Sequence, residues 1–550
     1  MRRAYLPVWL WVATALLSGM VSLGQNPGDA GDLHAGDRGT ALSVGRWVEG
    51  GTSVAAGTAV VVDWRSTYQT WEGFGASSMF YEDNLMRLGE PARTEVFDLI
   101  FRDLGATILA IRLYSDFQPS EGAPYNWSAM ANQRAICQAA LARGVIDRIW
   151  ARVSSPPGWM KTNGSPINGG HVRPEYYDEY AAYCRDYVLG MQNTYGIPIH
   201  AFAIFNEPGH SHPYETTETT PEEFRDILKV VGADFDAHGL AGVRQFAPDS
   251  PMLQILENYT GYNYLRTIAE DPVALGYLDV ISVHSYDDKA GNGPWAQCRS
   301  AAAAAGRPIW QTEVCNLSSA QHNIFGACWG SWWAHRAINI GQVTAWHWWQ
   351  YHFPQEATAD QGLVALTRTG GYVVYPRYYM LRQWAKHVRP GAVRVSAASD
   401  NADLHVSAFK DGDVVVIVAT NFRYGGGAVE TLATFTCPAI RGDVAHVRTS
   451  ATENHAGQPP IHPTGDSFSV IIPALTINTF IVPVAATTPG DMNCDGSVNF
   501  DDINPFVLAL SDPGGYAAAY PNCYILNGDC NGDGAVDFGD INPFVGLLTR

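Results

Sequence analysis

Two glutamates each close a short apolar run, and their side chains are equipped for the same chemistry. Glu207 lies in the run Ile204–Pro208, and Glu313 lies in the run Ile309–Val314. Each carboxylate is therefore expected at the carboxyl end of a buried strand, which is the active-site face of a (β/α)8 barrel. A pair of carboxylates at that face can break a glycosidic bond, with one as acid/base and the other as nucleophile.

The neighbours of the two glutamates indicate which role each one takes. Asn206 can hydrogen-bond a sugar 2-hydroxyl beside Glu207, so we assign Glu207 as the acid/base and expect its pKa to be raised. Glu313 must stay ionised to attack the anomeric carbon, and Arg112 and Tyr286 are candidates to supply the charge and the hydrogen bond that keep it ionised. A separation of ~5–5.5 Å between the carboxyl groups predicts retention of configuration.

Several other reactive side chains near these motifs are interpreted differently. His210 and His212 follow the acid/base motif, and we interpret them as substrate-facing or solvated rather than as metal ligands. Asp249 is interpreted as structural, and Cys315 as a packed residue rather than a nucleophile. The sequence therefore predicts a site whose chemistry depends on two carboxylates alone, without a cofactor for catalysis.

The elements that must position these residues alternate along the chain between about residues 60 and 390. Strand-like runs are separated there by helix-like ones such as Pro174–Met191, Pro221–His238 and Trp329–Ile340, which is the pattern of α/β proteins. Eight strand-like runs favour a closed barrel over an open doubly wound sheet. These runs are Trp71–Ala76, Thr107–Tyr114, Asp147–Ser154, His200–Phe205, Val243–Ala247, Leu278–His284, Pro308–Thr312 and Val343–Trp349.

The segment after Pro390 changes to short alternating runs such as Leu404–Phe409, Asp413–Thr420 and Phe468–Ile472. This pattern predicts a β-sandwich of about seven to nine strands, which the run Ala55–Val62 could join. The expected fold class is thus α/β, a TIM barrel with an attached β-sandwich side domain and a small α-helical calcium-binding module. The expected boundaries are a signal peptide (1–24), a linker (25–40), strands joining the side domain (41–60), the barrel (61–390), the β-sandwich (391–485), a second linker (486–490) and the terminal module (491–550).

The C-terminal tail contains one motif twice, each copy ending in a helix-like run, Ile503–Leu510 or Ile541–Leu548. Oxygen-bearing side chains stand at loop positions 1, 3, 5, 9 and 12 around a glycine turn, which is the EF-hand calcium geometry. We expect calcium to fold this module rather than to assist catalysis. The proposed ligands are Asp491, Asn493, Asp495, Asn499 and Asp502 in the first copy and Asp529, Asn531, Asp533, Asp537 and Asp540 in the second.

The ends and the composition of the chain bear on its location. Arg2 and Arg3 precede an apolar run, Leu6–Leu17, which is the pattern of a secretory signal peptide and is shorter than the ~20 apolar residues of a membrane span. The 35 basic and 54 acidic side chains give a net charge of −19, which argues against a nucleic-acid partner. The nine cysteines permit disulfides in an exported chain, and we consider one that staples the two tail repeats. We therefore expect a secreted protein without a membrane span.

Several motifs together resemble glycoside hydrolase family 30 of clan A, over about residues 60–485. They are Trp71–Ser77, Ser154–Gly164, Phe205–Pro208, Trp310–Glu313 and Tyr378–Gly391. The resemblance implies a (β/α)8 barrel fused to a side β-sandwich, and a subsite lined by Arg112, Asn206, His284 and Tyr286 with Trp346 or Trp348 as its floor. We also place Trp159, in the Ser154–Gly164 loop, among the substrate-binding residues.

The substrate and the partner are expectations from the same resemblance. The loop Lys161–Gly170 favours an endo-β-1,4-xylanase, but no arginine occurs in Trp349–Glu356 to read a glucuronic acid branch. A β-1,6-glucanase, a β-1,6-galactanase, an exo-acting β-glycosidase and a carbohydrate-binding protein on a decayed barrel stay open as alternatives. The tail resembles a type I dockerin, which implies a cohesin-type scaffold protein as partner.

Overall fold

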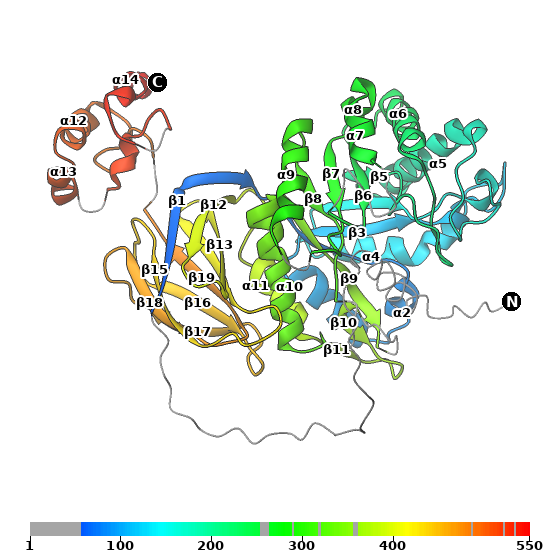
Figure 1. Ribbon diagram of the computed structural model, residues 1–550, viewed down its shortest axis with the longest axis horizontal. Helices are drawn as coiled ribbons and strands as arrows, with labels where there is room; N and C mark the ends of the chain where they lie inside the picture. The colour runs from blue at the N-terminus through cyan, green and yellow to red at the C-terminus, as the bar shows by residue number, and fades with distance from the viewer. Residues whose placement is uncertain are drawn as a thin grey trace, which may run out of the picture.

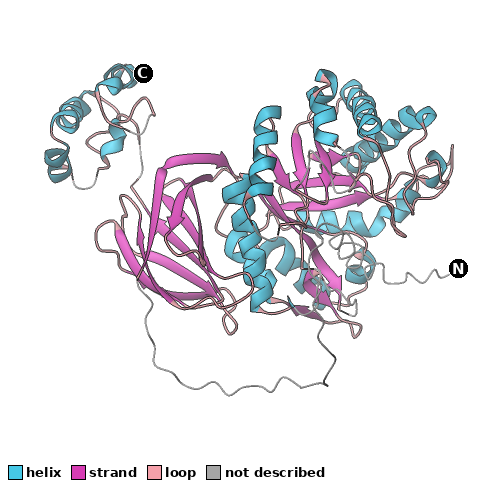
Figure 2. Cartoon of the chain, in the orientation of Figure 1, coloured by secondary structure: helices cyan, strands magenta, loops and turns pink. Residues whose placement is uncertain are grey.

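The computed structural model of this protein describes residues 57–253, 263–288, 291–316, 321–355, 361–485, 488–520, 523–532 and 535–549. The expected signal peptide and first linker lie outside these residues. Figure 1 shows a helix-lined barrel beside a β domain, with a small helical module at the C-terminal end. Figure 2 separates the strand-rich domain from the barrel, in which helices surround the strands.

Eight of the described strands form a closed parallel barrel, as the sequence predicts. Each strand pairs in parallel with the next, and pairing of the last strand with both the seventh and the first closes the ring. Each of the eight predicted runs overlaps one of these strands, and three of the strands (β2, β6 and β9) extend beyond the carboxyl end of their run. They are β2 (Gly73–Ser77), β3 (Ile108–Leu113), β4 (Arg148–Val153), β5 (Ala201–Ala203), β6 (Arg244–Ser250), β7 (Val280–Val283), β8 (Ile309–Gln311) and β9 (Ala345–Pro354). The second half of β9 leaves the barrel and pairs with β10 (Gly362–Leu366), which pairs with β11 (Tyr372–Val374).

The helices that surround the barrel begin and end where local chemistry favours it. At the start of α6 (Pro221–Ala237), the Thr220 side chain accepts a hydrogen bond from the Glu223 backbone N–H, and the Glu223 side chain accepts one from the Thr220 backbone N–H. Pro221 occupies the first turn of this helix. The barrel helices are α2 (Glu82–Met86), α3 (Ala92–Asp98), α4 (Ala131–Leu141), α5 (Tyr177–Leu189), α6 (Pro221–Ala237), α7 (Tyr264–Ala269), α8 (Pro272–Tyr277), α9 (Gly293–Ala305), α10 (Ile324–Arg336) and α11 (Pro376–Ala385). No described helix is both long and apolar enough to cross a membrane.

The side domain is one continuous hydrogen-bonded sheet of nine described strands that folds over onto itself. Phe435 and Phe480, from opposite parts of the sheet, meet in its core with ring centroids 5.0 Å apart. Its strands are β1 (Thr58–Thr70), β12 (Val393–Ser399), β13 (Leu404–Asp411), β14 (Val414–Asn421), β15 (Thr431–Thr436), β16 (Val444–Thr449), β17 (Ala456–Ile461), β18 (Ser467–Ile472) and β19 (Thr476–Pro483). Because β1 pairs with β12 and β15 and runs to Thr70, the barrel begins after Thr70 and not at residue 61 as expected.

The C-terminal module contains the two predicted helices, α12 (Ile503–Ser511) and α14 (Ile541–Leu548), and a third, α13 (Pro513–Ala519). Phe506 and Phe544, at the same place in the two repeats, stack with centroids 4.1 Å apart and form the centre of its core. A disulfide joins Cys494 to Cys523, so a covalent link does connect the first repeat to the segment before the second.

The barrel and the side domain meet along α10 and α11, which pack on β13, β14, β16 and β19. Two pairs of histidines lie in this interface. The Nε2 atoms of His387 and His455 are 3.1 Å apart, and the rings of His335 and His405 have centroids 5.3 Å apart. Each pair joins a barrel segment to the side domain, so a charge on one ring is felt by the other.

All four histidines are held in the neutral form. Burial, together with nearby Lys386 and Arg382, lowers the pKa of His387 to about 4, and burial, Arg382 and His387 do the same for His455. In the other pair, burial is the largest cause that lowers the pKa of His335 and of His405. His405, Arg336 and Arg394 add to it for His335, whereas for His405 Arg336 adds to it and Asp403 and the Phe422 carbonyl oppose it.

Acidification should therefore loosen this interface. The unfolded chain binds protons near pH 6.5 and the folded chain only well below that, so the contribution of these histidines to stability is complete above pH 6.5 and is lost as pH falls toward 4. The free energy of unfolding should fall by up to about 1.4 kcal/mol per pH unit for each histidine. We expect Tm measured between pH 7 and 4.5 to fall less steeply in the double variant His387→Gln, His455→Asn, whose asparagine tolerates the positive φ of 53° at position 455.

The control is His462→Gln, which removes a histidine that is 79% exposed on the side domain. It should leave the pH dependence of Tm as in the wild type. Equal slopes in the double variant, the control and the wild type would show that the interface histidines do not govern acid stability.

Candidate active site

Three residues at the carboxyl ends of neighbouring strands have positive φ angles, a backbone conformation that residues other than glycine rarely adopt. Glu207 after β5, Asp249 in β6 and Ser285 after β7 have φ values of 47°, 58° and 68°. Such positions cost about 1–3 kcal/mol each and persist where the surroundings hold them. One restraint is the hydrogen bond from the Glu207 N–H to the Asp249 carbonyl, 3.1 Å. The strain lies where the predicted acid/base is placed.

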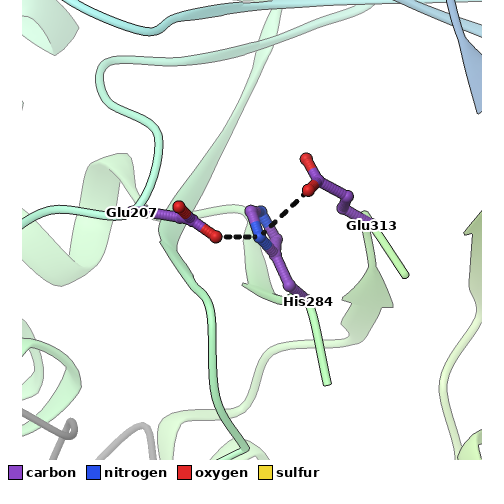
Figure 3. Close-up of side chains that lie close together, drawn as sticks. All are labelled: Glu207, His284 and Glu313. Carbon is purple, nitrogen blue, oxygen red and sulfur yellow. Dashed lines mark hydrogen bonds and ion pairs between the residues drawn. The ribbon is translucent and has the colours of Figure 1, made fainter. Parts of the chain in front are cut away.

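The two predicted catalytic carboxylates come together at this face, on either side of one imidazole ring. His284 Nδ1 lies 2.9 Å from Glu207 Oε1 and 3.8 Å from Glu313 Oε1 (Figure 3). The Nδ1 atom and one oxygen from each carboxylate all lie within 4.8 Å of one another. This spacing fits direct attack by one carboxylate and leaves too little room for a water between them, the arrangement of retaining glycosidases.

The imidazole between the carboxylates is positively charged. Burial alone would lower the pKa of His284, but Glu313 and Asp249, with hydrogen bonds to Asp249 and Glu207, raise it to about 10. Its other nitrogen, Nε2, lies 3.4 Å from Asp249 Oδ2. The imidazolium therefore occupies the place between Glu207 and Glu313 that a bound cation would otherwise take.

The pKa of Glu207 is shifted in the direction opposite to the expected one. Burial acts to raise this pKa, but hydrogen bonds from His210 and His284 outweigh burial and lower it well below its usual range. His210 Nδ1 lies 3.7 Å from Glu207 Oε2, so it lies beside the acid/base rather than in bulk solvent. These opposite pKa shifts place the proton on His284, whose Nδ1 lies 2.9 Å from the predicted acid/base Glu207.

Glu313 is held from two sides. The Tyr286 hydroxyl donates a hydrogen bond of 2.8 Å to Glu313 Oε1, as the sequence analysis anticipates. The guanidinium that reaches Glu313 Oε2 belongs to Arg152 on β4 and not to Arg112. Arg152 and Trp150 are two residues apart on β4, so their side chains lie on the same face of the strand. Trp150 Nε1 donates to His347 across the barrel, so both side chains point inward. An inward arginine within an apolar strand was the signal that sequence reasoning passed over.

Arg112 forms its ion pair with a residue other than Glu313. Its guanidinium forms an ion pair with Glu215, which also accepts a hydrogen bond of 2.6 Å from Ser115. The same guanidinium lies 3.8 Å from the centroid of the Phe80 ring and 4.0 Å from that of the Tyr114 ring. The expectation that Arg112 keeps Glu313 ionised is therefore wrong, because Glu215 holds it on another part of the face.

The two tryptophans predicted to form the floor of the subsite do not face the interior of the barrel. Trp346 and Trp348 are fully buried, and Trp348 packs on α10, where Gly330 leaves room for its ring. Trp349 lies on the inner side, its ring 5.2 Å from the Arg152 guanidinium. The cause is the regular alternation of side chains along β9: His347, which accepts from the inward Trp150, shares one face of the strand with Trp349, and Trp346 and Trp348 share the other.

Asn206 and Trp159 lie on loops at the active-site face. The Oδ1 atom of Asn206 is buried and has no hydrogen-bond partner among the described residues, so it is available to a ligand hydroxyl. Trp159 is partly exposed, and its Nε1 donates to the Gln118 carbonyl at 3.0 Å. The loop of Trp159 is joined to the loop that follows Glu207, for example by the Lys161 ammonium donating to the Thr216 carbonyl at 2.7 Å.

The placement of the two tryptophans leads to contrasting predictions. Trp349→Ala should lower the kcat/KM of the folded protein, because the ring covers the Arg152 guanidinium beside the predicted nucleophile, and it should also lower Tm, because the ring is buried. Trp346→Ala should lower the free energy of unfolding by about 3–5 kcal/mol, because it opens a cavity in the packed core. Thermal unfolding and initial rates on a soluble β-glycan, both measured below Tm, check the two effects. The reverse pattern would return the floor of the site to Trp346.

The fold and the site can be compared with known proteins. The glucuronoxylanase XynC of Bacillus subtilis strain 168 is 26% identical over 440 residues, which cover 79% of this chain and 94% of XynC. The endo-β-1,6-galactanase of Hypocrea rufa is 24% identical over 433 residues, covering 68% and 83% of the two chains. The crystal structure of a GH30 endoxylanase from Clostridium papyrosolvens C71 matches with a TM-score of 0.62 and 26% identity, over 78% of this chain and 100% of that one. No protein-family model matches the chain. These relatives and structural neighbours are glycoside hydrolases, and the barrel with its side domain is a catalytic domain similar to the family 30 xylanases.

Proposed function

We propose that this protein is a secreted, retaining endo-β-glycanase with Glu207 as acid/base and Glu313 as nucleophile. The observation that carries the proposal is the approach of the two carboxylates to within 4.8 Å around His284. A decayed, purely carbohydrate-binding barrel has no need to keep both carboxylates, the Tyr286 hydrogen bond of 2.8 Å and the buried charge partners together.

The reaction follows from the positions of these groups. Glu313 attacks the anomeric carbon while a proton from Glu207 passes to the leaving glycosidic oxygen, and a covalent glycosyl-enzyme forms. In the second step Glu207 takes a proton from water, and the water oxygen displaces Glu313 from the anomeric carbon. The proton that Glu207 needs for the first step is available from His284 Nδ1 at 2.9 Å. The free Oδ1 atom of Asn206 accepts a hydrogen bond from a sugar hydroxyl.

We propose a β-1,4-xylan backbone without obligatory charged branches as the substrate. XynC and the Clostridium papyrosolvens endoxylanase support xylan as the glycan. A branch carboxylate favours a bidentate arginine, but Arg112 is already paired with Glu215 and the strand-eight segment Trp349–Gln355 contains no arginine. The galactanase relative supports a β-1,6-linked galactan as the second candidate.

A panel of glycans with product analysis tests this proposal. Wild-type protein should release oligosaccharides from unsubstituted xylan early in the reaction, with retained configuration, and Glu207→Gln should lower kcat by about 10²–10⁴-fold on unactivated glycans. Glu313→Ala should be inactive, and azide should rescue it as a glycosyl azide of inverted configuration.

Each alternative has its own outcome in the same panel. Early monosaccharides would indicate an exo-acting enzyme, and activity confined to β-1,6-glucan or β-1,6-galactan would change the substrate. Binding without turnover in the wild type and both variants would leave only the carbohydrate-binding role.

We propose that the C-terminal module is dockerin-like and binds structural calcium in its two loops. The loops share a hydrogen-bonding plan that supports this: Asp502 accepts the Met492 and Asn493 N–H groups, and Asp540 accepts those of Cys530 and Asn531. Burial, then the charges of Asp502 and Asp495, raise the pKa of Asp491, so a cation that neutralises this first loop would stabilise the module. Asp533 lies outside the described residues.

A scaffold protein of the cohesin type is the proposed partner of this module. The two repeats each expose three apolar side chains at matching places, which suits a protein interface. They are Phe500, Ile503 and Val507 in the first repeat and Phe538, Ile541 and Val545 in the second. The Cys494–Cys523 disulfide suits an oxidising compartment and supports export through the signal at residues 1–24.

Removal of calcium should unfold the module and spare the barrel. A chelator should abolish amide protection in residues 491–549 in hydrogen exchange, since repulsion among the loop carboxylates is then uncompensated. Initial rates of hydrolysis should stay at their untreated value, and added calcium should restore protection. Loss of activity in parallel with loss of protection would indicate that the two parts do not fold independently.

A further inference from the structure

Arg152 is an almost fully enclosed cation beside the predicted nucleophile. It extends from β4 with its side chain 1% exposed. One terminal nitrogen, Nη2, donates to Glu313 Oε2, and the other, Nη1, lies 3.2 Å from Asp249 Oδ2 and 3.3 Å from His284 Nε2. The ring of Trp349 covers the same guanidinium at 5.2 Å. This one side chain thus bridges five strand ends of the barrel, those of β4, β6, β7, β8 and β9.

The charges around Arg152 explain why a cation is needed there. Glu207, Asp249 and Glu313 are three carboxylates in a closely packed site, and Arg152 and protonated His284 are the cations that face them. Removing one partner of such a buried set leaves an uncompensated charge, which is strongly unfavourable. Asp249 is fixed in turn by the Thr312 hydroxyl, which donates to its Oδ1 at 2.6 Å.

The shape of the group matters as much as its charge. A guanidinium presents two nitrogens in a rigid fork and can hold two carboxylates at a set angle, whereas an ammonium is a single point charge. Here the fork spans Glu313 at the end of β8 and Asp249 in β6. Its Nε has no partner among the described residues, so the two carboxylates and the Trp349 ring are what orient it.

We propose that Arg152, braced by Asp249, is the positioning residue of the nucleophile: its guanidinium aims Glu313 Oε1 at the anomeric carbon by holding Oε2. This inference rests on the proposed function and goes beyond it, because it assigns to the third barrel strand a role that the sequence analysis gave to Arg112. The held oxygen accepts from Arg152 and the attacking oxygen from Tyr286, so the carboxylate cannot rotate. Arg152 also stabilises the carboxylate that leaves when water cleaves the glycosyl-enzyme, so it serves both steps.

The test compares Arg152→Met and Arg152→Lys in the full-length protein. An aryl β-xylobioside with a good leaving group is the substrate, because its cleavage needs little help from an acid and so reports the nucleophilic step. Arg152→Met should lower kcat by about 10²-fold or more with a small change in KM. Arg152→Lys should restore part of kcat by its charge, but not wild-type kcat, because it cannot hold both carboxylates.

Two further measurements separate positioning from a structural role. Guanidinium chloride at millimolar concentration should raise the rate of Arg152→Ala by refilling the vacated place, and should not raise that of the wild type. The acidic limb of the kcat/KM profile should move to higher pH in Arg152→Met, because the carboxylate cluster has lost a cation. The matched control is Arg143→Met, which breaks the Arg143–Asp98 ion pair of 2.7 Å outside the site and should change Tm without changing the profile.

The outcomes distinguish this inference from the proposed function. If Glu313→Ala abolishes turnover but Arg152→Met keeps wild-type kcat and pH profile, only the role of Arg152 is overturned. The same holds if Arg152→Met loses activity solely in proportion to its loss of folded protein by circular dichroism and if guanidinium fails to rescue Arg152→Ala. If Glu313→Ala stays active, the proposed function itself fails.

Discussion

The burial of charge at the carboxyl ends of the barrel strands is the constraint on which this structure depends. Three carboxylates, those of Glu207, Asp249 and Glu313, lie close together where water cannot solvate them well, and ions buried without partners are very costly. Arg152 and the imidazolium of His284 provide the compensation. Because these groups come from separate strands, the site exists only when the barrel is closed, and charge and closure support each other.

The side domain packs against the two helices, α10 and α11, that cover strand β9 behind the site. Its contacts with α10 and α11 are polar as well as apolar, such as the hydrogen bond of 2.6 Å between the hydroxyls of Ser331 and Thr420. These helices cover the outer face of β9, where Trp348 is buried, and the same strand carries Trp349 on its inner face. Strand β1 enters this domain before the barrel starts, so the chain joins the two domains at both ends of the barrel.

The pattern of apolar residues predicted the positions of most strands and helices, and the incorrect predictions concern which side chains face the site. Eight strand-like runs and both tail helices lie close to their predicted places, because apolar periodicity and capping residues are local signals. The site residues were harder: Arg112 was expected beside Glu313 and Trp346 or Trp348 as the floor, whereas Arg152 pairs with Glu313 and Trp349 covers Arg152. The direction of the pKa shift of Glu207 also escaped prediction, because it depends on two histidines brought beside it by the fold.

The sequence by itself determined the order of the elements, the pair of carboxylates at strand ends and the duplicated loop-and-helix motif of the tail, since each depends on neighbouring residues. The tertiary structure decided which arginine pairs with Glu313, which tryptophan faces inward and which residue, His284, has the raised pKa. The physical reason is that strand register, the choice of which face of β9 turns inward and the summed field of Glu313, Asp249 and Arg152 arise only when distant segments meet. Spacing along a chain can place a charged group at a strand end, but only packing can give it its partner.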